Sequence, residues 1–236
     1  RIMVIECNLR SSRSFPFVSK ILKQNFIEIA TKVIMGKKAR SERTIWDIGY
    51  IGVKAPQFSF SRLRGADPTL SVEMSSTGEV ACIGDDVQEA FLKSMLSTGY
   101  RIPEKSILVS ISGTENKAKM LKHIRNMSSL GYEIYATYNT SRFLKENGVE
   151  NTMLHKVHER KKPNIADYIG ECKFDLVINV PHEGEDTAME DEYMIRRMAV
   201  DFSVSLITNP QLARLFLKSI RNKNTRDLKI KSWDEY

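Results

Sequence analysis

The chain has 236 residues, 42% of them hydrophobic, and a formal net charge of +7 with a pI near 9.2. A chain of this length and apolar content is expected to fold as one large or two ordinary domains, which argues against wholesale disorder. No apolar run reaches the length of a membrane span, no secretory signal pattern opens the chain, and the scattered cysteines Cys7, Cys82 and Cys172 are typical of reduced thiols in an intracellular protein.

The positive charge is spread along the chain. Residues 1–103 carry 15 basic and 10 acidic side chains, and residues 104–236 carry 21 and 19. There is no long basic run with interleaved aromatic residues, apart from a mild cluster between Arg214 and Lys231. Because anionic small molecules explain such an excess equally well, the pI is a weak basis for a nucleic-acid-binding module.

The residue pattern of the first part of the chain predicts short helices and strands in an irregular order. Gly36 ends the first predicted helix, Asp85 is a candidate N-cap for the second, and Pro103 breaks any continuation beyond it. We therefore place a domain boundary between residues 103 and 104. The predicted elements are a strand at 2–5, a helix at 26–35, a strand-like stretch at 50–60 and a helix at 87–98.

Beyond residue 104 the apolar patterns alternate regularly between strand and helix. Alternation of this kind predicts a doubly wound α/β domain whose parallel sheet is covered on both faces. Ligands of such sheets bind at the carboxyl ends of the strands. The predicted strands are 106–112, 132–137, 152–157, 174–180 and 204–208, and the predicted helices are 115–130, 141–147, 165–169, 193–200 and 210–221.

The stretch IECNLRSSRSFPFVSK opens the chain with a concentrated set of polar groups. Glu6 and Asn8 are two apart on the predicted strand end, so they share a face and can bind one hard cation such as magnesium. Arg10 and Arg13 then supply forked donors for phosphate oxygens. Since such chemistry needs further groups, the stretch is interpreted as half of a site.

Three predicted strand ends in the second part carry candidate anion-binding groups. Thr137 and Thr140 lie where a strand leads into a helix, Lys156 follows another strand, and Asn179 ends the apolar strand FDLVINV. Hydroxyls beside free helix amides can hold a phosphate, although Thr140 or Ser141 could equally be a plain helix cap and the loop at 155–164 a solvated charge run. The histidines of that loop lack a third ligand of clear spacing, so a metal site there is not favoured.

The opening stretch, the motif EMSSTGEV at 73–80 and the strand–helix series together resemble the large subunit of carbamoyl-phosphate synthetase. The resemblance runs the whole length of the chain. It implies that residues 1–103 are the C-terminal part of an ATP-grasp domain, and that residues 104–236 are a methylglyoxal-synthase-like regulatory domain.

For the first part, the resemblance implies a share of the site that phosphorylates carbamate. In the family, the positions of Glu6 and Asn8 bind the Mg²⁺ or Mn²⁺ ions that bridge the ATP phosphates, and those of Arg10 and Arg13 line the phosphoryl-transfer pocket. The parent enzyme makes carbamoyl phosphate from bicarbonate, ATP and glutamine or ammonia, with a glutaminase subunit or domain as partner. The nucleotide-binding part is expected to precede residue 1, so the chain alone is expected to be inactive.

For the second part, the resemblance implies an effector site for a nucleotide or phosphoribosyl compound. The phosphate contacts of the family carry over to Thr137, Thr140 and Lys156, with Lys117 as a further candidate, and Asn179 matches an effector-contacting asparagine. Where bacterial relatives continue with two threonines, this chain has Val180 and Pro181. The full enzyme is expected to be an oligomer in the cytoplasm, with the mitochondrion as the alternative.

Two alternatives within the same fold remain open. A methylglyoxal synthase, which is a lyase, would need an aspartate in a glycine-rich turn after the strand at 174–180, where this chain has PHEGED with Glu185 and Asp186. An acetylglutamate-regulated, urea-cycle enzyme would carry a tryptophan in the loop at 155–162, whereas Trp46 and Trp233 lie elsewhere. The resemblance therefore favours a nucleotide-regulated enzyme of pyrimidine type.

Overall fold

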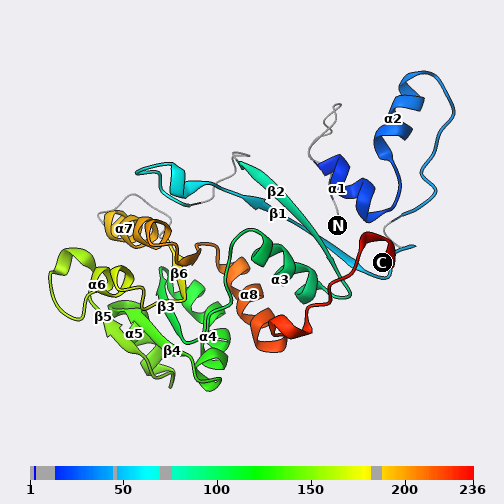
Figure 1. The fold of residues 1–236 in the computed structure, drawn as a ribbon. Helices are drawn as coiled ribbons and strands as arrows, with labels where there is room; N and C mark the ends of the chain where they lie inside the picture. The colour runs from blue at the N-terminus through cyan, green and yellow to red at the C-terminus, as the bar shows by residue number, and fades with distance from the viewer. Residues whose placement is uncertain (1–2, 4–13, 45–46, 70–75, 182–187) are drawn as a thin grey trace.

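The fold is that of a computed structural model, which describes residues 3, 14–44, 47–69, 76–181 and 188–236. Its centre is a five-stranded parallel sheet with the strand order β5-β4-β3-β6-β7 (Figure 1). The prediction of a doubly wound parallel sheet in the second part is thereby confirmed. The strands are β3 (Ser106–Ile111), β4 (Glu133–Thr137), β5 (Thr152–Leu154), β6 (Leu176–Val180) and β7 (Ser205–Ile207).

Helices cover both faces of this sheet, so β3 and β6 are buried along their whole length. The side chains of Ile107 and Val109 pack with residues of α3, α4, α5 and α8, while Leu108 and Val177 pack with α6 and α7. Burial on both faces explains why these strands are continuous apolar runs. The helices are α4 (Thr114–Ser129), α5 (Tyr138–Glu146), α6 (Ile165–Gly170), α7 (Ala188–Asp201) and α8 (Pro210–Asn222).

The first part of the chain contributes two helices, an antiparallel strand pair and a third helix. Gly84 is the last residue of the strand pair and lies against the first turn of the third helix. A Cβ atom at this position would lie 2.5 Å from the backbone nitrogen of Ala90, so only glycine allows the strand to lie this close to the helix. The elements are α1 (Ser14–Ile21), α2 (Phe26–Ile34), β1 (Ile51–Gln57), the 3₁₀ turn η2 (Phe60–Arg62), β2 (Gly78–Gly84) and α3 (Val87–Ser97).

One hydrophobic core joins α3 to the parallel sheet. Phe91, Leu92 and Met95 belong to the same buried cluster as Ile107 and Phe216. The boundary between residues 103 and 104 stays a prediction, and α3, which precedes it, is packed into the second part of the chain.

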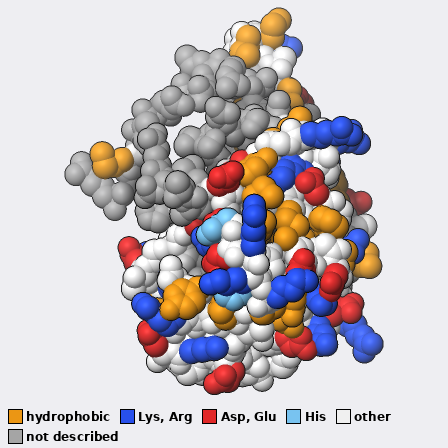
Figure 2. All heavy atoms as spheres, turned by 90° about the vertical axis from the view of Figure 1, so that its left-hand side faces the viewer, with side chains coloured by type: hydrophobic (Ala, Val, Ile, Leu, Met, Phe, Trp, Pro, Cys, Tyr) orange, Lys and Arg blue, Asp and Glu red, His pale blue; other side chains and the backbone are white. Residues whose placement is uncertain are grey.

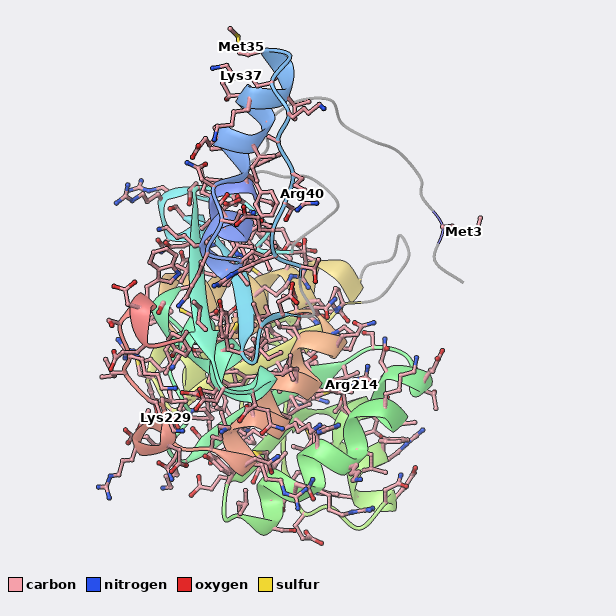
Figure 3. The ribbon with its side chains drawn as sticks, turned by 90° about the vertical axis from the view of Figure 1, so that its right-hand side faces the viewer. Met3, Met35, Lys37, Arg40, Arg214 and Lys229 are labelled. Carbon is pink, nitrogen blue, oxygen red and sulfur yellow. The ribbon has the colours of Figure 1, made fainter. Side chains whose placement is uncertain are left out.

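The helices α1 and α2 extend away from this core. No residue of α2 is buried, and Met35 and Lys37 lie at the far tip of the projection (Figure 3). Within the described ranges, no helix is both long and apolar enough to cross a membrane.

Several predicted element limits were wrong for identifiable reasons. The N-cap of α3 is Asp86, whose side chain accepts from the Glu89 amide, because Asp85 is instead engaged by lysines of the C-terminal segment. Helix α5 begins at Tyr138 rather than 141, since weak helix formers are tolerated in a first turn. Strand β5 ends at Leu154, and only an isolated bridge joins His155 to Asn164 beyond it.

Candidate functional site

The predicted metal and phosphoryl-transfer residues lie outside the described part of the chain. These are Glu6, Asn8, Arg10 and Arg13, and their roles stay predictions. Among the described residues, no group of three or more His, Cys, Asp or Glu side chains is placed to hold a metal ion.

Three polar side chains form a row across the carboxyl ends of neighbouring strands, and we call Thr137, Ser110 and Asn179 the polar row. Ser110 is paired with Asn179 in register, and the Thr137 hydroxyl lies 3.3 Å from the Ser110 hydroxyl. Each residue is two positions beyond one that faces α6 and α7, so the row lies on that face of the sheet. All three are at least 95% buried.

Thr140 connects this row to the start of α5. Its hydroxyl accepts a hydrogen bond of 3.1 Å from the Ile111 amide and lies 3.4 Å from the Thr137 hydroxyl. The structure thus brings the two predicted threonines together with Ser110. Thr137 is the residue that precedes α5, and its side chain makes no capping bond to that helix.

Asn179 is fully buried, and within the part of the chain that the structure describes its amide is bonded through the oxygen end only. Its Oδ1 atom accepts a hydrogen bond of 2.9 Å from Nη1 of Arg196 on α7. Its Nδ2 atom is buried and has no hydrogen-bond partner among the described residues. A buried donor without a partner costs about 1–3 kcal/mol, so this nitrogen is an unusual feature of the carboxyl edge of the sheet.

Lys156 lies at the start of the 3₁₀ turn η3 (Val157–Glu159), beside α7. Its Nζ atom is 3.8 Å from Oδ2 of Asp191, which also lies 2.5 Å from Nδ1 of His158. His155 contacts a different carboxylate, and its hydrogen bond lowers the pKa of Glu159. Lys156 is therefore paired with an acidic residue of α7.

Lys117 reaches the start of α5 from the first turns of α4. Its Nζ atom donates to the carbonyl oxygen of Asn139 over 3.4 Å. Burial lowers the pKa of this lysine, and the nearby charge of Arg142 lowers it further. The five predicted effector residues are thus distributed around the carboxyl edge of the sheet, and direct contact is made only between the two threonines.

The sequence reasoning missed four residues that the structure places in or beside this site: Ser110, Arg196, Asp67 and Asp191. Ser110 could have been found as a polar residue at an inward position of the apolar strand SILVSIS. Arg196 stands in the apolar stretch YMIRRMAV, where a charge at a buried position indicates a partner. No local pattern signals Asp67, because its partner is 129 residues away.

An apolar cavity of about 410 Å³ lies apart from the polar row. It is lined by residues of β1, α3, β7 and the loops beside them, including Val53, Met95, Tyr100 and Leu206. None of the five predicted effector residues lines it. Charged side chains of both signs are interspersed over the face of the molecule seen in Figure 2.

A family model described as the MGS-like domain matches residues 119–208. That range begins in α4 and ends after β7, so it includes all of the polar row except Ser110. Residues 119–208, within the second part of the chain, therefore match the MGS-like domain. A crystal structure of methylglyoxal synthase from Elizabethkingia anophelis NUHP1 aligns at 16% identity with a TM-score of 0.38, covering 56% of this chain and 90% of its own.

Longer proteins are similar to nearly the whole chain. The "Multifunctional protein CAD" of Squalus acanthias is 45% identical over 235 residues, which are 94% of this chain and 10% of that protein. The "Multifunctional protein pyr1-3" of Dictyostelium discoideum is 46% identical and covers 93% of this chain and 10% of its own length. The mitochondrial "Carbamoyl-phosphate synthase (ammonia)" of Rattus norvegicus is 42% identical over 97% of this chain and 16% of its own length.

The chain is homologous to a segment of carbamoyl-phosphate synthase and of these multifunctional proteins, which confirms the resemblance. It spans about a tenth to a sixth of the length of the relatives named above.

Proposed function

We propose that this chain is the C-terminal part of a carbamoyl-phosphate synthase, the ligase that makes carbamoyl phosphate from bicarbonate, ATP and glutamine or ammonia. The observation that carries the proposal is the extent of the similarity. The rat synthase is 42% identical over 97% of the chain, whereas the MGS-like model accounts only for residues 119–208. A lyase consisting of an MGS-like domain alone would leave the first part of the chain without a counterpart.

Within this proposal the first part carries half of a carbamate-phosphorylating site. Glu6 and Asn8 would bind Mg²⁺ or Mn²⁺ beside ATP, and Arg10 and Arg13 would stabilise the transferred phosphoryl group. The complementary half and a glutaminase subunit or domain would come from the rest of the parent protein. We propose the cytoplasm as its location, with the mitochondrion as the alternative because the rat relative is named mitochondrial.

The second part would bind an anionic effector at the carboxyl edge of its sheet. The polar row and the unpartnered Nδ2 atom of Asn179 support this role, because hydroxyl and amide groups suit phosphate and carbonyl oxygens. Lys117 and Lys156 supply positive charge around the same edge. We propose a nucleotide or phosphoribosyl compound as the effector, in agreement with the pyrimidine-type interpretation.

Calorimetry of the chain against UTP, UMP, IMP, phosphoribosyl pyrophosphate and acetylglutamate tests this function. Binding of a nucleotide or phosphoribosyl compound, weakened by Thr137→Val, is the expected result. Thr152→Val, at the opposite end of the sheet, is the matched control and should bind as the unaltered chain does. Binding of acetylglutamate alone would favour the urea-cycle type, and conversion of dihydroxyacetone phosphate to methylglyoxal would favour the lyase.

A further inference from the structure

Arg196 connects the polar row to the first part of the chain. Its Nη1 atom donates to Asn179 Oδ1 over 2.9 Å, while Nε and Nη2 donate to the two carboxylate oxygens of Asp67 over 2.7 and 2.5 Å. Arg196 is 2% exposed and Asn179 is 0% exposed. One buried guanidinium therefore contacts the candidate effector site and a residue more than a hundred positions earlier in the sequence.

The guanidinium determines which way the amide of Asn179 is turned. Arginine has five N–H donors and no acceptor, so only the amide oxygen of Asn179 can face it. A reversed amide would set two donors against each other in a buried place, which is strongly unfavourable. The amide nitrogen is therefore left for the site, where it can donate only to an acceptor such as a phosphoryl or carbonyl oxygen.

Asp67, the partner of Arg196, belongs to a segment that α7 contacts at several points. This segment consists of residues 60–67, which precede β2. Arg197 Nη1 donates to the carbonyl oxygens of Phe60, Leu63 and Ala66 over 3.1–3.2 Å. The Tyr193 hydroxyl donates to the carbonyl oxygen of Gly65 over 3.0 Å. Of these helix residues, Arg196 is the one that also contacts the polar row.

We propose that Arg196 is a positioning residue which presents Asn179 as a donor to an acceptor-bearing effector and couples occupancy of that site to segment 60–67. The proposal rests on the proposed effector-binding function. A ligand oxygen on Nδ2 would polarise the amide and strengthen the Asn179–Arg196 bond, and so change how Arg196 shares its donors with Asp67. Because the coupling between the two sites is a free energy, weakening the contact between Asp67 and Arg196 should change effector affinity in turn.

The test uses the ¹⁵N-labelled chain and the variant Asp67→Asn. Asp201→Asn is the matched control, because Asp201 binds the neighbouring Arg197 on the same helix without touching Asn179. Without ligand, Asp67→Asn should shift the side-chain NH₂ signals of Asn179, and Asp201→Asn should not. With UTP as the probe, saturation should shift the backbone signals of residues 65–67. UTP affinity should fall about two- to thirtyfold in Asp67→Asn.

The Asn179 signals measured without ligand test the positioning role of Arg196 independently of effector binding. If no compound of the panel binds the unaltered chain, the effector function fails, and the coupling through Arg196 to a ligand falls with it. If UTP binds but Asp67→Asn moves neither the Asn179 signals nor the affinity, the positioning role is overturned while the effector function stands. Arg196→Lys, which keeps the charge but cannot fork to both partners, must give the same loss if Asp67→Asn does not fold.

Discussion

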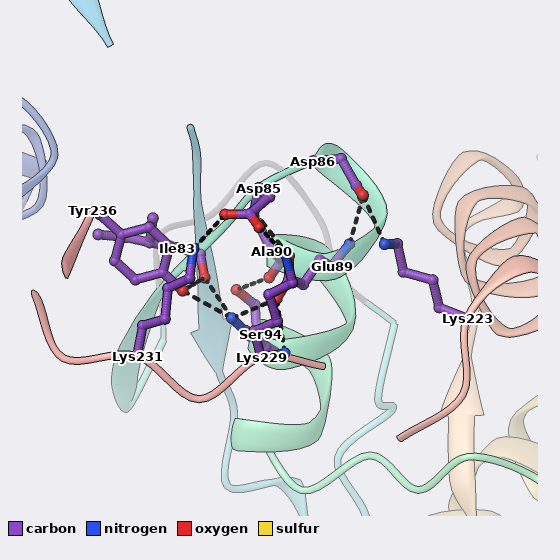
Figure 4. A network of polar contacts seen from close by, with 11 residues as sticks. Ile83, Asp85, Asp86, Glu89, Ala90, Ser94, Lys223, Lys229, Lys231 and Tyr236 are labelled. Atoms are coloured by element: carbon purple, nitrogen blue, oxygen red, sulfur yellow. Dashed lines mark hydrogen bonds and ion pairs between the residues drawn. The ribbon is translucent and has the colours of Figure 1, made fainter. Parts of the chain in front are cut away.

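The Nζ atom of Lys229 lies 2.7 Å from Oδ2 of Asp85, and this pair holds the C-terminal segment against the turn between β2 and α3 (Figure 4). Lys231 contacts the other oxygen of the same carboxylate over 2.8 Å. Lys223 pairs with Asp86 over 2.7 Å, and the Tyr236 hydroxyl lies 3.0 Å from the carbonyl oxygen of Ile83. Three lysines on two neighbouring aspartates thus attach residues 223–236 to the first part of the chain.

Replacing Asp85 by Asn should loosen this segment without unfolding the molecule, because exposed ion pairs contribute little to global stability. We expect faster trypsin cleavage after Lys229 and Lys231 in Asp85→Asn, measured by mass spectrometry. Glu171→Gln, which removes an isolated surface pair with Lys173, is the control and should leave these rates unchanged. Equal cleavage in both variants would show that the lysine contacts do not hold the segment.

The same contacts predict an acid response. Hydrogen bonds from Lys229 and Lys231 lower the pKa of Asp85 from 3.8 to about 2. A carboxyl group whose pKa is depressed by folding stabilises the folded state above its unfolded value and loses that contribution as the pH falls through the folded value. Release of the C-terminal segment, followed by hydrogen exchange, should therefore increase between pH 3.8 and about 2. In Asp85→Asn this pH dependence should weaken, and the contribution of Asp86, whose pKa is lowered by the hydrogen bond from Lys223, should remain.

The shared core predicts that α3 and the parallel sheet unfold together. Leu92 is fully buried in the cluster that contains Ile107 and Phe216, so Leu92→Ala should cost roughly 2–5 kcal/mol. Hydrogen-exchange protection should fall in parallel for β2, β3 and β6. Val87→Ala, on an exposed position of the same helix, should change protection little. Loss of protection confined to residues before 104 would mean that the two parts unfold independently.

His123 on α4 should titrate below the ordinary histidine range. Burial lowers its pKa, and the charges of Arg214, Lys122, Lys218 and Arg221 lower it further. Since folding disfavours its protonated form, stability should decrease as the pH falls through 6.5. Arg214→Gln should raise this pKa in an NMR titration of the imidazole signals. Arg125→Gln, whose guanidinium is bonded to the carbonyl oxygen of Asn147, is the control with no expected effect.

The regular part of the fold was predictable because its signals are local. Apolar runs such as SILVSIS and FDLVINV form buried strands of a sheet that is covered on both faces. Each of these strands was predicted from its run of apolar residues. The misplaced cap at Asp85 has a different origin. Lys229 and Lys231 bind this carboxylate, and no sequence pattern near residue 85 predicts these two contacts.

The candidate site was predictable by residue type and strand position, but its connections were not. Thr137 and Thr140 were identified from their place at a strand end, and the structure joins them to Ser110. The contacts of Asn179 with Arg196, and of Arg196 with Asp67, depend on how α7 crosses the sheet and on where segment 60–67 returns to it. Such long-range pairings follow from the tertiary fold and leave no periodicity in the sequence.

Lys156 provides the sharpest test of the effector site, because the carboxylate of Asp191 and the phosphate of an effector would both attract its ammonium group. Its side chain is 26% exposed, and its Nζ atom lies 3.8 Å from Asp191. A charge-assisted contact with a phosphate is worth roughly 1.5–3 kcal/mol. Lys156→Ala should therefore weaken binding of the effector about ten- to a hundredfold by calorimetry. Lys162→Ala, an exposed lysine of the same loop that pairs with Asp167, is the matched control and should change affinity little.

Asp191→Asn should act in the opposite direction to Lys156→Ala. Asp191 is 7% exposed and places a negative charge beside Lys156 and His158, where it opposes the approach of a polyanion. Its neutralisation should raise effector affinity, and the gain should disappear in the double variant with Lys156→Ala, because the two side chains interact directly. In the parent enzyme neither change should alter synthesis measured without effector, since the coupling of two sites is separate from the chemistry of one. A gain that persists without Lys156 would place the phosphate elsewhere on the sheet edge.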